Sequence, residues 1–224
     1  MQTTATAEAS TFPRLLLKHA TERPGAPAMR EKEYGIWQTR SWADMATLVE
    51  HLACGLHQAG LQRGEHMIVV GANRPRLSAT MLAAQALGAI PVPLYQDAAA
   101  AECVFPITNA EVRFCLVEDQ EQVDKMLEVR ESCPQLAHIY YDDPRGLRNY
   151  HEAGLTALDD LLTAGKSFAA SHPTFFKDEV AKAHATDVAA MFFTSGTTGN
   201  PKGVVHTHSS LIDRAQAAAE FDTL

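Results

Sequence analysis

The sequence predicts an α/β protein with a doubly wound, mainly parallel sheet and flanking helices. Between residues 41 and 141, short β-branched runs bounded by turn residues alternate with longer amphipathic segments. The segments between consecutive runs are long enough for helical crossovers, which join parallel strands. The chain has 224 residues, 46% of them hydrophobic, so it can bury a large core without disulfides or a structural metal. These three observations define the expected fold class.

The first strong helix signal begins at Ser41. Asp44, three positions later, forms a variant of the capping box, and apolar residues then recur at helical spacing until Gly60. The run MIVV over residues 67–70 has the length and the branched side chains of a buried strand. The sequence therefore predicts a helix followed by the first strand of the sheet.

Asn73 followed by Pro75 predicts the start of the next helix, which runs to about residue 87. The alternation continues with a strand over 90–94, a helix over 100–109, a strand over 112–117, a helix over 120–131 and a strand over 136–141. Prolines and glycines interrupt the pattern from 142 to 187, where only a modest helix near 158–162 is expected. A regular pattern of secondary structure is expected again after 187, with a strand over 189–193, a polar glycine loop, a strand over 203–207 and a helix over 210–220.

These elements divide the chain into three expected parts. They are a disordered leader over 1–11, an α/β subdomain over 12–165, and, over 166–224, a linker and the start of a second subdomain that carries the polar loop. The leader lacks the early positive charge and the apolar stretch of a secretory signal. The charge-free run over 77–96 is broken by Gln85, Gly88 and two prolines, so we expect no transmembrane segment.

Charge and cysteine content narrow the class of protein further. The 19 basic and 27 acidic residues give a formal net charge of -8, which argues against nucleic acid as a partner and against non-specific binding to an anionic membrane. The spacing of the four cysteines matches no zinc or redox motif, so we interpret them as reduced core thiols of a cytoplasmic protein. They are Cys54, Cys103, Cys115 and Cys133.

The polar loop between the last two predicted strands carries the chemistry. Residues 194–203, TSGTTGNPKG, contain four hydroxyls, three glycines and one lysine. Glycines let backbone N–H groups converge on an anion, while hydroxyls and a lysine add donors and positive charge, so the loop suits a polyphosphate. It is not the usual P-loop, because its glycines are closer together and a strand follows it. A flexible hairpin loop made of turn-forming residues is the alternative that composition alone leaves open.

The string TSGTTGNPKGV over residues 194–204 resembles the phosphate-loop signature of the adenylate-forming superfamily, which includes acyl-CoA synthetases, luciferases and peptide-synthetase adenylation domains. The segments over 88–94 and 187–190 also look like parts of that family. The segments over 117–125 and 143–148 resemble its bacterial long-chain fatty acyl-CoA synthetase branch. The resemblance extends from about Phe12 to the end of the chain.

This resemblance implies an enzyme that activates a carboxylate with ATP and Mg²⁺, giving an acyl-adenylate and pyrophosphate, and then forms a thioester with CoA. It assigns the cradling of the β- and γ-phosphates to the first part of the loop and their neutralisation to Lys202. The cradling residues are Thr194, Ser195, Gly196, Thr197, Thr198 and Gly199. The alternative for Lys202 is a solvated surface lysine that does not bind phosphate. His206 and His208 alternate along the predicted strand, but no third ligand stands nearby, so we expect no metal site in them.

The family motifs that follow the loop have no counterpart after Gly203. The resemblance therefore implies that the catalytic residues lie beyond Leu224, that the chain is a truncated N-terminal portion, and that it is inactive alone. Three hypotheses follow: a portion of a long-chain fatty acid ligase, a non-catalytic nucleotide-binding module, or an inert fragment. Each predicts association through the face that the missing half leaves uncovered.

Overall fold

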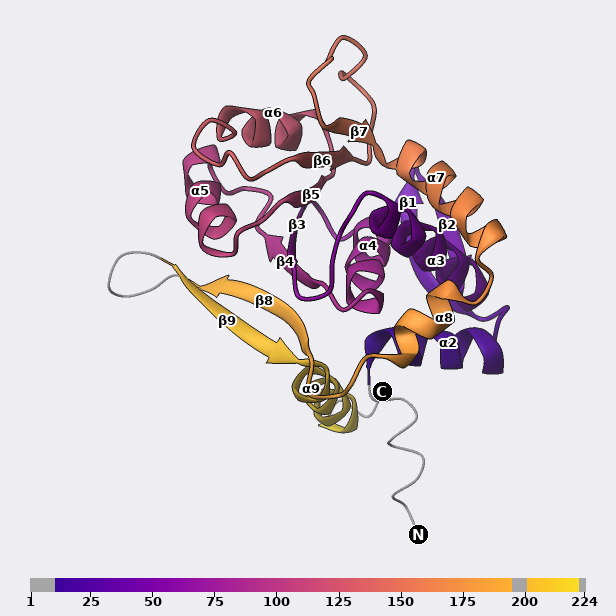
Figure 1. The fold of residues 1–224 in the computed structure, drawn as a ribbon. Helices are drawn as coiled ribbons and strands as arrows, with labels where there is room; N and C mark the ends of the chain where they lie inside the picture. Colours follow the sequence, from indigo (N-terminus) through magenta and orange to yellow (C-terminus); the bar gives the residue numbers. More distant parts are fainter. Residues whose placement is uncertain (1–10, 195–200, 222–224) are drawn as a thin grey trace.

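The computed structural model describes residues 11–194 and 201–221 and contains a five-stranded, fully parallel sheet (Figure 1). The order of its strands is β4-β3-β5-β6-β7. They span His66–Val70 (β3), Ile90–Leu94 (β4), Phe114–Val117 (β5), His138–Tyr141 (β6) and Leu155–Ala157 (β7). In chain order this is the 2-1-3-4-5 arrangement of a doubly wound sheet, so the predicted fold class is confirmed.

Helices cover both faces of the sheet. One face holds α2 (Phe12–Glu22), α3 (Trp42–Gln58), α4 (Pro75–Ala86), α7 (Leu158–Ser171) and α8 (Phe175–Ala181), and the other holds α5 (Ala100–Asn109) and α6 (Gln120–Glu128). Two cores result because side chains alternate along each strand. Met67 and Val69 of β3 pack toward α3 and α4, whereas Ile68 and Val70 pack toward α5 and α6.

Two antiparallel hairpins accompany this sheet. The first joins β1 (Pro27–Glu33) to β2 (Ile36–Ser41), and the second joins β8 (Val188–Thr194) to β9 (Lys202–Thr207), which leads into α9 (His208–Phe221). In Figure 1 the β8–β9 hairpin, in orange and yellow, lies beside β4. The strands predicted on either side of the polar loop are therefore present, and they pair with each other rather than with the parallel sheet.

The segment from 142 to 187 is more regular than the sequence predicts. It contains β7, a helix α7 that runs well beyond the expected 158–162, and α8. The packing of α7 on α3 explains why residue 165 is a glycine. A Cβ at this position would meet the backbone oxygen of His51 and lie 2.7 Å from the backbone nitrogen of Gly55. This glycine allows two helices to approach closely and does not interrupt α7. The expected division at residue 165 falls within α7, and the division into domains stays a prediction.

Smaller differences lie at the helix ends. Residue 11, the last of the expected leader, is the buried N-cap of α2, and residues 1–10 lie outside the described residues. Pro75 is the first residue of α4 as predicted, but Arg74 and not Asn73 occupies the N-cap position, with no side-chain hydrogen bond to the helix. The capping box of Ser41 and Asp44 forms as predicted at the start of α3.

Candidate functional site

The polar loop closes the β8–β9 hairpin. Thr194 and Lys202 face each other as the last backbone pair of the two strands, and both side chains are exposed. Ser195, Gly196, Thr197, Thr198 and Gly199 lie outside the described residues. The structure thus places the two ends of the predicted phosphate loop side by side at the tip of a hairpin. The roles of the individual loop residues stay predictions.

A cavity of about 710 Å³ adjoins this tip. Its walls come from the end of β8, the carboxyl ends of β3 and β4, and the first turns of α4. The lining residues include Gly71, Ala72, Asn73, Leu77, Ser78, Met81, Tyr95, Gln96, Asp97, Phe192, Phe193 and Thr194. The combination of apolar walls with backbone and hydroxyl groups is typical of a site for a small organic ligand. Sequence reasoning missed this cavity because its walls come from four separate segments.

The body of the hairpin packs on the sheet side that faces α5. Met191 and Phe193 contact the core around α5 and α6, and Phe193 meets Phe105 of α5 edge-on with ring centroids 6.2 Å apart. On β9, His206 packs edge-on against Phe192 at 5.6 Å. Aromatic packing therefore contributes to the contacts of the half of the hairpin that leads to the loop.

His208 secures the base of the same hairpin. The Nδ1 atom of its buried ring accepts a hydrogen bond from the backbone N–H of Phe12 at 3.3 Å, and the backbone N–H of His208 donates to the carbonyl of Asp187. Burial lowers the pKa of His208 to about 4, so the ring is neutral at pH 7 and can accept this bond. His208 is the first residue of α9 and not, as expected, part of the last strand. No group of three potential metal ligands occurs among the residues that the structure describes.

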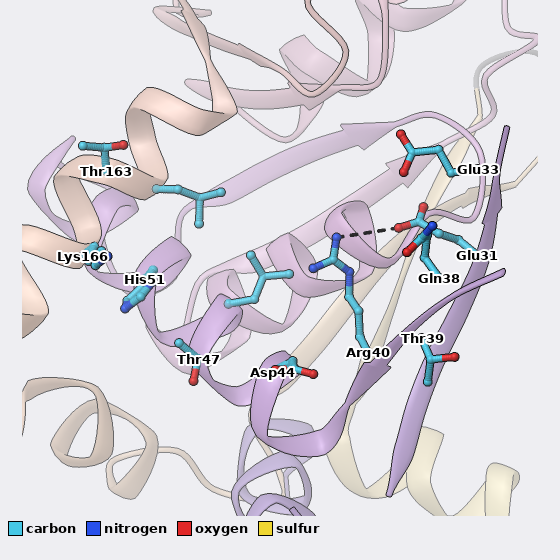
Figure 2. A pocket seen from close by; sticks show the side chains of 12 residues that line it. Glu31, Glu33, Gln38, Thr39, Arg40, Asp44, Thr47, His51, Thr163 and Lys166 are labelled. Carbon is cyan, nitrogen blue, oxygen red and sulfur yellow. Dashed lines mark ion pairs between the residues drawn. The ribbon is translucent and has the colours of Figure 1, made fainter. Parts of the chain in front are cut away.

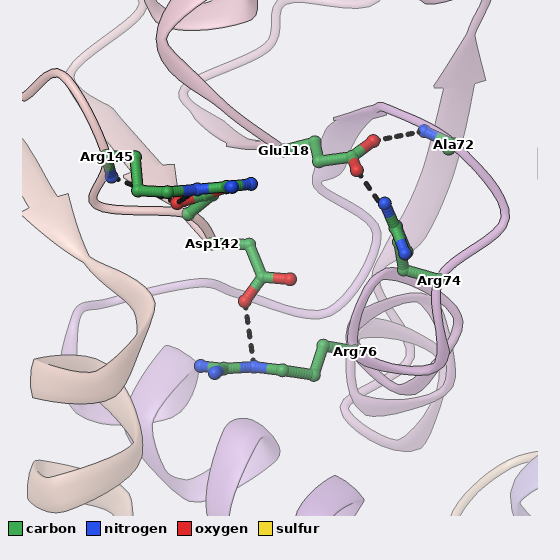
Figure 3. Close-up of polar contacts among 7 residues, drawn as sticks. Ala72, Arg74, Arg76, Glu118, Asp142 and Arg145 are labelled. Carbon is green, nitrogen blue, oxygen red and sulfur yellow. Dashed lines mark hydrogen bonds and ion pairs between the residues drawn. The ribbon is translucent and has the colours of Figure 1, made fainter. Parts of the chain in front are cut away.

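The carboxyl ends of β3 and β5 form the point where the strand order reverses, which is the usual ligand site of doubly wound sheets. Here a side chain of the protein fills it. Glu118 accepts hydrogen bonds from the backbone N–H of Ala72 at 2.5 Å and from Arg74 Nε at 3.0 Å (Figure 3). A carboxylate of the protein therefore engages a backbone N–H and a guanidinium group that lie near this point of the sheet.

The neighbouring acidic residues are also paired. Asp142 lies 2.8 Å from Arg76 Nε, and Asp143 pairs with Arg145 (Figure 3). Burial raises the pKa of Asp142, whereas the hydrogen bond from Arg145 lowers the pKa of Asp143. These contacts support the interpretation of the acidic residues after β6 as structural and not as a separate acidic site.

A second hollow, of about 580 Å³, lies between the β1–β2 hairpin and the helices α3 and α7. Figure 2 shows Glu31 and Glu33 of the hairpin at one end and His51 and Lys166 at the other, with Arg40 pairing with Glu31 at 3.7 Å. Charges of both signs line this hollow and largely balance one another.

The remaining sequence expectations concern cysteines and membranes. All four cysteines are buried and free, which confirms their interpretation as core thiols. Among the helices that the structure describes, none is long and apolar enough to cross a bilayer.

Comparison with known proteins assigns the family. The AMP-binding enzyme family matches residues 16–223, so the chain belongs to this family of adenylate-forming enzymes. The long-chain-fatty-acid–CoA ligase FadD15 of Mycobacterium bovis is 27% identical over 207 residues, which cover 92% of this chain and 33% of that protein. The human long-chain-fatty-acid–CoA ligase ACSBG2 is 29% identical over 187 residues, which cover 83% of this chain and 27% of that protein. The chain thus spans about a third of the length of the curated relatives it matches.

Solved structures agree on the fold. The anthranilate CoA ligase AuaEII, in complex with anthranoyl-AMP, superposes with a TM-score of 0.76 at 20% identity, covering 92% of this chain and 36% of that one. The N-terminal domain of FACL13 from Mycobacterium tuberculosis gives 0.72 at 25% identity, covering 94% of this chain and 47% of that one. The chain therefore has the fold of part of an adenylate-forming N-terminal domain.

Proposed function

We propose that this chain is the phosphate-binding N-terminal portion of an ATP-dependent acyl-CoA ligase. The proposed reaction joins a carboxylate to the AMP moiety of ATP with release of pyrophosphate, and then transfers the acyl group to the thiol of CoA with release of AMP. The observation that carries the proposal is the pairing of Thr194 with Lys202, which brings both ends of the glycine- and hydroxyl-rich loop together beside the cavity. A long-chain fatty acid is the proposed substrate because FadD15 and ACSBG2 are long-chain-fatty-acid–CoA ligases.

The residues of the loop suit this chemistry. ATP with Mg²⁺ supplies, when bound, the adenylyl group that turns a poor electrophile into a reactive one and a pyrophosphate that can leave. We propose that backbone N–H groups and hydroxyls of residues 194–199 donate to the β- and γ-phosphates and that the ammonium group of Lys202 balances their charge. The groups that bind CoA and complete catalysis are proposed to lie outside this chain, which is therefore proposed to be inactive alone.

Two measurements test the proposal on the 224-residue chain. We expect a calorimetric titration to detect MgATP binding, and we expect no palmitate-dependent exchange of pyrophosphate into ATP above background. Absence of ATP binding would contradict the assignment of the loop. Robust exchange would show that the chain already holds the catalytic groups.

A non-catalytic nucleotide-binding module is the second candidate, because the pairing of Thr194 with Lys202 bears on nucleotide binding and not on the later steps of a ligase. The two candidates differ in their response to the rest of a ligase. Exchange activity that appears when the chain is mixed with the remaining two thirds of FadD15 would support the ligase, while ATP binding without any such complementation would favour the module. For either candidate we propose a reducing cytoplasmic location, which the four free cysteines suit.

A further inference from the structure

Helix α4 connects two parts of the candidate site. Its first turns, with Leu77, Ser78 and Met81, line the cavity beside the carboxyl end of β3. Its last turn carries Gln85, which is only 7% exposed and faces β8. One rigid element therefore spans from one wall of the cavity to the strand that leads into the phosphate loop.

The contact between Gln85 and β8 occurs at an irregularity in the hairpin. Val188 pairs with Thr207 and Ala190 with His206, so Ala189 is an additional residue in β8 at a β-bulge. Ala189 is fully buried, and its carbonyl oxygen accepts a hydrogen bond of 2.8 Å from Gln85 Nε2. A buried carbonyl needs a hydrogen-bond donor, and at this irregularity the side chain of Gln85 supplies one.

The place of the Gln85–Ala189 hydrogen bond along β8 determines which part of the hairpin it can position. Ala189 lies five residues before Thr194, roughly 17 Å along an extended strand, so a small change of tilt at the bulge moves the loop by a larger distance. The main-chain contacts at the base of the hairpin, from His208 to Asp187 and from Ser209 to Ala185, lie on the other side of the bulge. Gln85 is therefore the polar contact between α4 and β8 that lies at the bulge itself.

We infer that Gln85 is a positioning residue, which sets the tilt of the β8–β9 hairpin and thereby holds Thr194 and Lys202, the paired ends of the proposed phosphate loop, beside the cavity. The inference rests on the proposed function, since it assumes that the loop binds phosphates. Gln85 belongs to a helix, but its proposed role concerns a strand that lies 104 positions further along the sequence.

A second buried glutamine, on the other face of the sheet, provides a control. Gln122 of α6 is also buried, and its Nε2 donates to the carbonyl of Gln96 at 3.1 Å. In both glutamines the Oε1 atom is buried and has no hydrogen-bond partner among the described residues. Leucine substitution at either position removes one buried hydrogen bond, but only Gln85 contacts the hairpin.

The test uses inorganic tripolyphosphate and MgATP as probes of the whole chain. We expect Gln85→Leu to weaken tripolyphosphate binding roughly tenfold, the effect of one lost hydrogen bond, while Gln122→Leu leaves it within about twofold of wild type. Gln85→Glu tests the donor directly, because a carboxylate cannot donate but a carboxyl group can. Burial raises the pKa of such a group, so the affinity of Gln85→Glu relative to wild type should recover between pH 8 and pH 6.

Hydrogen exchange of the amides in 190–194 provides a readout that needs no ligand. We expect faster exchange there in Gln85→Leu than in Gln122→Leu. Equal exchange in the two variants, or faster exchange without loss of tripolyphosphate affinity, would overturn the positioning role. Failure of the wild type to bind either probe would instead contradict the proposed function, and the exchange result would still decide whether Gln85 holds the hairpin.

Discussion

Thr194 and Lys202 lie opposite each other as the last backbone pair of β8 and β9, although seven residues separate them in the sequence. This pairing brings the two ends of the loop together beside the cavity. Glu118 already engages the donors of Ala72 and Arg74 near the switch point of the sheet, which supports the proposal that the phosphates bind at the hairpin tip.

Removal of the lysine charge tests the loop most directly. We expect Lys202→Ala to weaken MgATP binding roughly tenfold or more, because a charge-assisted contact to a phosphate is worth about 1.5–3 kcal/mol. Lys177→Ala, at another exposed lysine on α8, is the matched control and should leave the affinity unchanged. Isothermal titration of both variants makes the comparison, and equal affinities would favour the interpretation of Lys202 as a solvated side chain.

His208 makes the stability of the chain depend on pH. Its pKa is lowered to about 4 in the folded state, so between about pH 6.5 and pH 4 the unfolded chain binds more protons than the folded one. The contribution of His208 to the free energy of unfolding should therefore be constant above pH 6.5. It should fall by at most about 3 kcal/mol as the pH drops to 4. In His208→Asn, where the side-chain oxygen can accept the Phe12 N–H without titrating, this part of the pH dependence should disappear.

Urea unfolding of wild type and His208→Asn at several pH values gives the comparison. Other histidines also titrate, including His66 and His138, whose pKa values are lowered mainly by burial. Only the difference between the two proteins isolates His208. A difference that does not change between pH 7 and pH 4 would show that the buried ring does not resist protonation.

Sequence patterns predicted best those elements whose signals are local. The capping box at Ser41 located the start of α3, because both of its hydrogen bonds join residues three positions apart. The β1–β2 hairpin was missed, since the alternating charges of Arg30, Glu31, Lys32 and Glu33 give no apolar face to recognise. The turn between its strands uses Tyr34 and Gly35, both at positive φ.

The candidate site also has one part that the sequence predicts and one part that it does not. The loop between 194 and 203 could be predicted because its residue types and spacing carry the signal. The contacts that hold it could not, since Gln85 binds Ala189 and Phe12 binds His208 across 104 and 196 positions of sequence. A buried glutamine or histidine has many structural uses, and only the fold shows which carbonyl or amide it meets.

Gly165 is one of the glycines that were expected to interrupt the regular pattern over 142–187, and its role in helix packing can be tested. We expect Gly165→Ala to destabilise the chain by about 3 kcal/mol despite the better helix propensity of alanine, because the new methyl group would collide with the backbone of α3. Gly25→Ala is the control, since a Cβ at that position meets no atom within 4 Å. A stabilised Gly165→Ala in thermal unfolding would mean that α7 and α3 do not approach this closely in solution.

Exposed apolar side chains on the last two elements lead to a prediction about association. Val204 and Val205 of β9 are 39% and 53% exposed, and Phe221 of α9 is 88% exposed. Because adjacent strand residues point to opposite faces, both faces of β9 present apolar surface. We expect the chain to self-associate at micromolar concentration in sedimentation velocity experiments, and we expect Val205→Ser with Phe221→Ser to shift it toward monomer. Ile36→Ser with Trp37→Ser removes comparable apolar surface from the first hairpin, so an equal shift in that control would place the contact away from β9 and α9.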